Sequence, residues 1–193
     1  MLKRIILIRH GQTNWNLAGK YQGHADIGLN ATGRAQARML AGRMRNEKID
    51  AVYSSDRVRA ADFAEIVFEG RKIRRNPGLR EICFGVFEGL TYNEIVDKYP
   101  ALSSRWFAKP FGTKIPGGEA PSVFKNRVLR AFRKLSRSGP DTTIAIVTHG
   151  GVINIIMSEG LKLNKHSYFV PALAGVNIIE FKKRKAVLKK WVE

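Results

Sequence analysis

The stretch Arg4-Ile-Ile-Leu-Ile-Arg-His-Gly-Gln-Thr-Asn-Trp-Asn16 indicates the fold class of this 193-residue chain. Residues 5–8 form a continuous apolar run rich in β-branched side chains, which is typical of a strand buried on both faces. Arg9, His10 and Gly11 follow this run directly. In open α/β sheets, ligands bind beyond the carboxyl ends of the strands. We therefore expect a functional site where this strand ends.

Two further runs, Ala51–Tyr53 and Thr143–Thr148, are also apolar and are each followed by polar residues or glycine and then by a helical pattern. Apolar spacing, capping residues and prolines predict the helices. The expected helices cover residues 31–46, residues 58–67, a segment that begins at Thr91 and is ended by Pro100, residues 122–135 and residues 151–159. Strands that alternate with helices predict an α/β fold, a three-layer sandwich whose mostly parallel central sheet is flanked by helices.

The second half of the chain adds two features to this framework. Val176–Phe181 and Ala186–Val192 flank a basic turn and predict a hairpin. We expect a single domain over residues 1–193, with a small helical cap inserted around residues 86–121 and a Pro- and Gly-rich loop over residues 107–121. Several aromatic residues either form the core of this cap or line an apolar substrate pocket: Tyr92, Tyr99, Trp106, Phe107 and Phe111.

Charge is the unusual feature of the composition. Lys and Arg number 34 against 16 Asp and Glu, which gives a net charge of +18. Such a surplus favours anionic partners: nucleic acid, an anionic membrane surface or phosphorylated small molecules. The basic residues are dispersed and no nucleic-acid-binding motif accompanies them, so a nucleic-acid partner is not expected. No 18-residue apolar run predicts a membrane span. The single cysteine, Cys83, and the lack of a signal-peptide pattern favour a cytoplasmic protein.

Two of the predicted parallel strands end in the same way. One is followed by His10-Gly11 and the other by His149-Gly150-Gly151, which predicts that two imidazoles converge on one pocket. The strand between them in sequence leads to Arg57 and Arg59, and either one could open a helix whose first N–H groups favour anions. Glu81 lies among apolar neighbours, where desolvation would keep its carboxyl group protonated.

Six segments follow one another along the chain: Arg9-His10-Gly11-x-Thr13-x-x-Asn16, Gln22-Gly23, Ser54-Ser55-Asp56-x-x-Arg59-Ala60, Leu79-Arg80-Glu81 with Phe84-Gly85-x-x-Glu88-Gly89, Pro116-Gly117-Gly118-Glu119, and Thr148-His149-Gly150-Gly151. Together they resemble the signature of the histidine phosphatase (phosphoglycerate mutase-like) superfamily, over nearly the whole chain. The sequence departs from that pattern at Phe63, where a threonine is common, and at Gly28, where a proline often stands. Neither position belongs to the catalytic set that the resemblance implies.

The resemblance implies a role for each matching residue. His10 would be the nucleophile that becomes phosphorylated, Glu81 would donate a proton, and the phosphoryl oxygens would be held by Arg9, Arg59 and His149. Further substrate-binding positions are Asn16, Gln22, Gly23 and Gly150. This chemistry is physically reasonable, because a neutral imidazole is a good nucleophile and arginine forks stabilise the equatorial oxygens of a transferring phosphoryl group. No metal or other cofactor is expected, and the four histidines show no zinc-type spacing.

The short segment between Glu81 and Pro116 is more similar to the phosphatase branch, which includes α-ribazole phosphatase and broad-specificity phosphatases, than to the mutases. We expect a metal-independent phosphomonoester hydrolase that acts through a phosphohistidine on a small phosphorylated metabolite, with α-ribazole phosphate as one candidate. The alternatives are a cofactor-dependent phosphoglycerate mutase and a nucleic-acid-binding protein with a vestigial site. The oligomeric state is left open, with a homodimer as one option.

Overall fold

A six-stranded sheet forms the centre of the protein, in the order β3-β2-β4-β1-β5-β6. The structure is a computed structural model that describes residues 2–109, 112–137, 139, 142–163, 171–182 and 185–192. The strands are β1 (Arg4–Arg9), β2 (Ala51–Ser54), β3 (Ile73–Arg75), β4 (Thr143–Thr148), β5 (Val176–Lys182) and β6 (Lys185–Val192). Strands β1 to β4 run parallel, whereas β5 pairs antiparallel with β1 and with β6. The predicted mostly parallel sheet and the C-terminal hairpin are confirmed, and the short strand β3 was not predicted.

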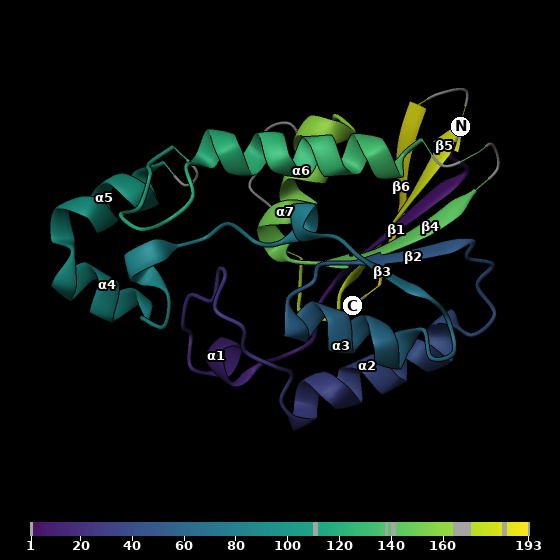
Figure 1. The fold of residues 1–193 in the computed structure, drawn as a ribbon, viewed down its shortest axis with the longest axis horizontal. Helices are drawn as coiled ribbons and strands as arrows, with labels where there is room; N and C mark the ends of the chain where they lie inside the picture. The colour runs from purple at the N-terminus through teal and green to yellow at the C-terminus, as the bar shows by residue number, and fades with distance from the viewer. Residues whose placement is uncertain are drawn as a thin grey trace.

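Helices cover both faces of this sheet (Figure 1). One face carries α2 (Ala31–Met44) and α3 (Val58–Val67), and the other carries α6 (Pro121–Leu135) and α7 (Gly150–Ile155), which a π-helical turn η3 (Ile156–Gly160) continues. Alternate side chains of β1 enter the two hydrophobic layers: Ile5 and Leu7 pack in one, and Ile6 and Ile8 in the other. All four are fully buried, so the apolar run that indicates the fold does lie between two helical layers, as expected for a three-layer α/β sandwich.

The segment between β3 and α6 extends away from the sheet (Figure 1). It contains the short 3₁₀ turns η1 (Pro77–Leu79) and η2 (Gly85–Phe87), then α4 (Tyr92–Lys98) and α5 (Pro100–Ala108). The expectation that Pro100 ends a helix is half right. Helix α4 stops at Lys98, but Pro100 opens α5, because a proline at the first helical position needs no N–H donor.

Aromatic rings of this extended segment pack on one another. The ring centroids of Tyr92 and Phe107 are 4.6 Å apart, and those of Phe87 and Tyr99 are 5.9 Å apart. Phe84 forms an edge-on contact with the buried Trp106, at 5.9 Å. These contacts are typical of a small aromatic core. We propose that residues 86–121 act as a cap. Phe111, which the sequence predicts to belong to this aromatic group, lies outside the described residues.

Helix α2 approaches the loop after β1 at a glycine. A Cβ atom on Gly33 would lie 2.1 Å from the carbonyl oxygen of Gln12, and a Cβ atom on Gly11 would lie 2.8 Å from both Gly33 O and a ring carbon of Phe63. Asn30 caps α2 by accepting a hydrogen bond from Gly33 N at 2.9 Å, and its amide donates to the Gln12 side chain. Helix α2 therefore fixes the backbone of the loop that carries His10.

A matched pair of substitutions in α2 tests this close contact. Gly33→Ala should lower the free energy of unfolding by more than about 1 kcal/mol, because its methyl group would overlap backbone atoms. Gly42→Ala lies in the same helix with no atom within 4 Å of its Cβ position and should raise it by up to about 1 kcal/mol. Urea unfolding measures both values. Equal stability of the two variants would contradict the account.

Candidate active site

A cavity of about 310 Å³ opens beyond the carboxyl ends of β1 and β4. The nine residues that the sequence places in the site all line it: Arg9, His10, Asn16, Gln22, Gly23, Arg59, Glu81, His149 and Gly150. The other lining residues are Gly19, Lys20, Tyr21, Phe84 and Gly151. The sheet topology explains the convergence, because parallel strands deliver their carboxyl ends to one edge of the sheet.

The two histidines face each other across paired strands. Arg9 is in register with Thr148, and His10 N donates to the Thr148 carbonyl at 3.0 Å. The imidazole rings of His10 and His149 meet edge-on, with centroids 5.1 Å apart and exposed fractions of only 3% and 0%. The predicted convergence of two imidazoles is therefore present.

The tautomer of His10 follows from its surroundings. Its Nδ1 lies 2.8 Å from the carbonyl oxygen of Gly11, which can only accept a hydrogen bond. Nδ1 therefore carries the proton, and Nε2 keeps its lone pair. Burial, reinforced by the cationic Arg59 and Arg9, lowers the pKa of His10 well below its ordinary value. The ring is neutral at neutral pH, which is the state that a nucleophile needs.

His149 is held by the end of a third strand. Its Nε2 lies 2.9 Å from Ser55 Oγ, and Ser55 N donates to the Val147 carbonyl at 3.0 Å. Burial and the neighbouring Arg59 also lower the pKa of His149 well below its ordinary value. Ser55 was quoted in a motif but not predicted as a site residue; its position directly after β2 was the available signal.

Of the two arginines that could open α3, Arg59 lines the cavity. Arg59 is 1% exposed, and its guanidinium donates to the carbonyls of Gly23 and Ala25 at 2.7 and 2.8 Å. Burial lowers the pKa of Arg59 to about 10, so the group remains charged at neutral pH. Arg57 is the N-cap residue instead and lies 3.9 Å from the carboxylate of Asp26. Arg59 is thus a fixed cation beside both imidazoles.

Glu81 presents its carboxyl group to the same cavity. Its two oxygens accept hydrogen bonds from Ile82 N at 3.0 Å and from Gly151 N at 2.9 Å. Desolvation raises the pKa of Glu81, although these two donors and the nearby arginines offset part of the rise. The carboxyl group therefore keeps its proton to a higher pH than an exposed glutamate would, as a general acid requires.

The smaller polar residues complete the cavity wall. Asn16 Oδ1 accepts from Thr13 N at 3.1 Å in the capping box of α1 (Asn14–Leu17), which leaves its amide N–H groups for the cavity. Gln22 is 8% exposed, and its Oε1 has no hydrogen-bond partner within the described residues. Gly23 has a φ of +49°, and a Cβ there would lie 2.1 Å from Glu88 Oε1.

Sequence reasoning missed three side chains on the outer part of the cavity wall, Lys20, Tyr21 and Phe84. Phe84 belongs to a quoted motif, and Lys20 and Tyr21 directly precede Gln22-Gly23; these positions were the signal that could have found them. His24 is partly buried and does not line the cavity. Its Nε2 lies 3.0 Å from the backbone carbonyl of Glu81.

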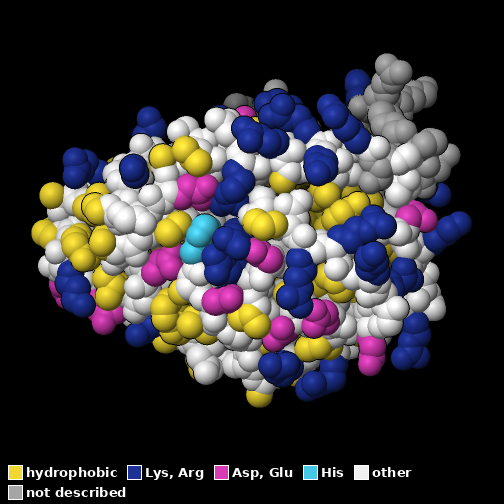
Figure 2. Space-filling view, viewed as in Figure 1, with side chains coloured by type: hydrophobic (Ala, Val, Ile, Leu, Met, Phe, Trp, Pro, Cys, Tyr) yellow, Lys and Arg dark blue, Asp and Glu magenta, His cyan; other side chains and the backbone are white. Residues whose placement is uncertain are grey.

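Outside the cavity, Lys and Arg side chains gather over α6 (Figure 2), where Lys125, Arg130, Arg133 and Lys134 are exposed. Nucleic-acid binding by such a surface stays an untested alternative. Within the described ranges, no helix has the length and apolar character to cross a membrane. The same part of the chain contains no group of three or more His, Cys, Asp or Glu side chains placed to hold a metal ion.

The buried imidazoles make stability depend on pH in a defined direction. His10 and His149 have lower pKa values in the folded protein than in the unfolded chain, where the value is about 6.5. Below about pH 6.5 the unfolded chain binds more protons, so the free energy of unfolding should fall as the pH falls, by up to about 1.4 kcal/mol per pH unit and site. Glu81, whose pKa is raised, contributes the opposite slope.

His10→Gln should therefore lose less stability than the natural protein between pH 7.0 and 5.5 in urea unfolding. Glu81 is present in both proteins, so its contribution cancels in the comparison. An equal loss in the two proteins would show that folding does not lower the pKa of His10.

Comparisons with known proteins agree with this geometry. The Histidine phosphatase superfamily (branch 1) profile matches residues 5–193. A metal-independent phosphoserine phosphatase of Arabidopsis thaliana is 33% identical, over 97% of this chain and 80% of the relative, and phosphoserine phosphatase 1 of Hydrogenobacter thermophilus is 28% identical, over 97% and 90%. The crystal structure of the α-ribazole phosphatase from Shigella flexneri superposes with a TM-score of 0.88 at 28% identity, covering 96% of this chain and 94% of that one. The chain therefore belongs to branch 1 of the histidine phosphatase superfamily and is a phosphoric monoester hydrolase of that family.

Proposed function

We propose that the chain hydrolyses the phosphate monoester of a small metabolite in two displacements, with His10 as the phosphorylated nucleophile. The observation that carries this proposal is the 2.8 Å contact between His10 Nδ1 and the Gly11 carbonyl, in a pocket that also holds Arg59. This contact leaves the Nε2 lone pair of a neutral imidazole available, beside a fixed cation that a phosphate group would neutralise.

In the first displacement, His10 Nε2 forms a bond to phosphorus while the bond from phosphorus to the ester oxygen breaks. Negative charge lies mainly on the three equatorial oxygens, and Arg9, Arg59 and His149, which line the cavity, would contact them. Arg59 is already fixed by two backbone carbonyls, so little reorganisation is needed as the charge shifts. The proton on Glu81 moves to the departing oxygen and leaves a carboxylate.

In the second displacement, a water molecule attacks the phosphohistidine. The carboxylate of Glu81 accepts a proton from that water, the oxygen bonds to phosphorus, and the bond from phosphorus to Nε2 breaks. His10 returns to its neutral form, Glu81 to its acid form, and inorganic phosphate leaves. One carboxyl group serves as acid and then as base, which a raised pKa favours.

The size of the cavity and the residues of its outer wall determine which leaving group the cavity accepts. The volume of about 310 Å³ is at the lower end for ligand pockets, which favours a small metabolite. Lys20 adds a cation there, and Tyr21 and Phe84 add aromatic surface. A phosphorylated amino acid such as phosphoserine would place its carboxylate near Lys20. Phosphoserine is therefore the first substrate to test and α-ribazole phosphate the second, since phosphatases named for each resemble this chain.

A panel of phosphomonoesters tests the proposal directly. The natural protein should release inorganic phosphate from at least one ester, with phosphoserine and α-ribazole phosphate included. His10→Ala should lower turnover by at least about 1,000-fold, because loss of a covalent nucleophile removes the main reaction path. Urea unfolding at pH 7 shows whether this variant is folded.

Two outcomes would contradict the proposal. Full turnover by folded His10→Ala would show that the reaction does not pass through a phosphohistidine at His10. Isomerisation of 3-phosphoglycerate that is primed by 2,3-bisphosphoglycerate, without phosphate release, would favour the mutase alternative.

A further inference from the structure

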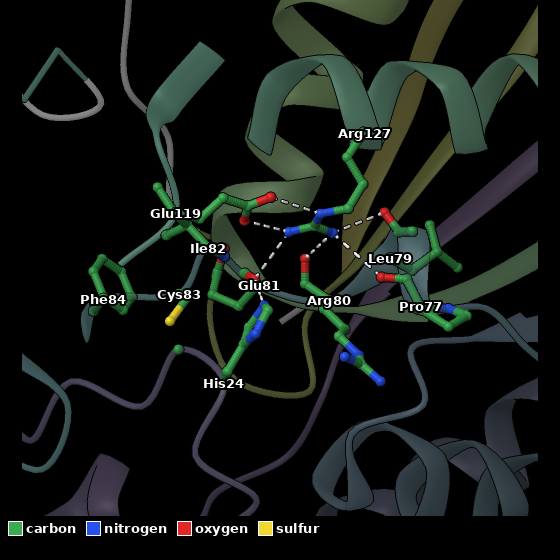
Figure 3. Close-up of polar contacts among 12 residues, drawn as sticks. His24, Pro77, Leu79, Arg80, Glu81, Ile82, Cys83, Phe84, Glu119 and Arg127 are labelled. Atoms are coloured by element: carbon green, nitrogen blue, oxygen red, sulfur yellow. Dashed lines mark hydrogen bonds and ion pairs between the residues drawn. The ribbon is translucent and has the colours of Figure 1, made fainter. Parts of the chain in front are cut away.

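Arg127 lies in α6, outside the cavity, and its guanidinium contacts the backbone of the segment that carries Glu81 (Figure 3). Nη1 donates to the carbonyls of Pro77, Gly78 and Arg80, at 3.3, 3.2 and 3.0 Å. Nη2 donates to the carbonyl of Glu81 at 3.3 Å. A single side chain thus contacts four carbonyls over five consecutive residues, which comprise the short 3₁₀ turn η1 and the two residues after it.

Glu119 aligns this guanidinium. Its two carboxylate oxygens accept from Arg127 Nε at 2.9 Å and from Nη2 at 2.6 Å, in a bidentate pair. The two side chains are only 23% and 12% exposed, so solvent screens the pair weakly. Glu119 N also donates to the Cys83 carbonyl at 3.0 Å. The pair therefore ties α6 to the backbone on both sides of Glu81.

The same carbonyl of Glu81 has a second contact. His24 Nε2 lies 3.0 Å from it, on the opposite side from Arg127 in Figure 3. The carboxyl oxygens of Glu81 are separately held by Ile82 N and Gly151 N. Backbone and carboxyl group are therefore fixed by different partners, and Arg127 provides the largest share of the backbone contacts.

We propose that Arg127, aligned by Glu119, is a positioning residue that sets the backbone of residues 77–81 so that the Glu81 carboxyl group reaches the leaving-group oxygen. This inference rests on the proposed role of Glu81 as the acid. A misplacement of about 1 Å costs up to about 100-fold in rate, so a fixed backbone matters for proton transfer. Only a planar fork fits this arrangement, because it bonds a carboxylate and a row of carbonyls at once.

The test compares two esters of similar shape, phenyl phosphate and p-nitrophenyl phosphate. Phenoxide is the more basic leaving group and depends more on a proton donor. Arg127→Met should lower kcat/KM for phenyl phosphate by about 10- to 100-fold and that for p-nitrophenyl phosphate by less than about 3-fold. Arg127→Lys should show most of the decrease in kcat/KM that Arg127→Met shows. Glu119→Gln should show a smaller decrease, again mainly for phenyl phosphate. Arg130→Met, an exposed arginine on the same helix, should change neither value.

Glu81→Gln is measured in parallel to separate this inference from the proposed function. If Glu81→Gln lowers kcat/KM by the same factor for phenyl phosphate and p-nitrophenyl phosphate, Glu81 is not the acid. The positioning role of Arg127 then fails as well. Glu81→Gln can instead lower kcat/KM mainly for phenyl phosphate, while Arg127→Met lowers kcat/KM equally for both esters or for neither. In that case only the positioning role of Arg127 is overturned. Should Arg127→Met fail to fold, Glu119→Gln, which keeps the side-chain volume, decides by the same criterion.

Discussion

The parallel pairing of β1 with β4 is the constraint on which the site depends. It places Arg9 opposite Thr148 and joins His10 N to the Thr148 carbonyl, so the residue after each strand is an imidazole that meets the other at 5.1 Å. The pairing is held by side chains that are fully buried between two helical layers. Helix α2, which contacts the loop through Gly33, and Ser55, which follows β2, then fix the direction of the two rings.

Electrostatics in the cavity follow from burial and not from the overall charge of the chain. Arg59 is almost fully buried and bonded to two carbonyls, and together with burial it keeps both imidazoles neutral. Desolvation acts on the Glu81 carboxyl group in the opposite sense and favours its acid form. The pocket is thus electropositive while its nucleophile is uncharged, a combination that suits a phosphate dianion. The net charge of +18 is mostly outside this pocket, where it contributes at most a general attraction for anions.

Much of this arrangement could be predicted from local sequence. A four-residue apolar run indicated the doubly covered strand, and histidines after two such runs indicated the pocket. Prediction stopped where contacts join distant residues: Arg127 reads as one of several basic residues on a helix, and nothing local shows that it reaches carbonyls 46 to 50 positions earlier. Pro100 was ambiguous for a related reason, because a proline can follow one helix and open the next. The local pattern left Arg57 and Arg59 open, and only the family resemblance selected Arg59, which lines the cavity.

The central claim is a covalent bond between phosphorus and His10 Nε2, and trapping the phosphorylated enzyme tests it most directly. The natural protein is mixed with p-nitrophenyl phosphate, quenched in alkali within the first turnover, digested and analysed by mass spectrometry. The account predicts one added phosphoryl group on the peptide that contains His10, formed and lost at least as fast as overall turnover. A phosphoryl group on another residue, or steady turnover with no phosphorylated peptide at any time, would contradict it.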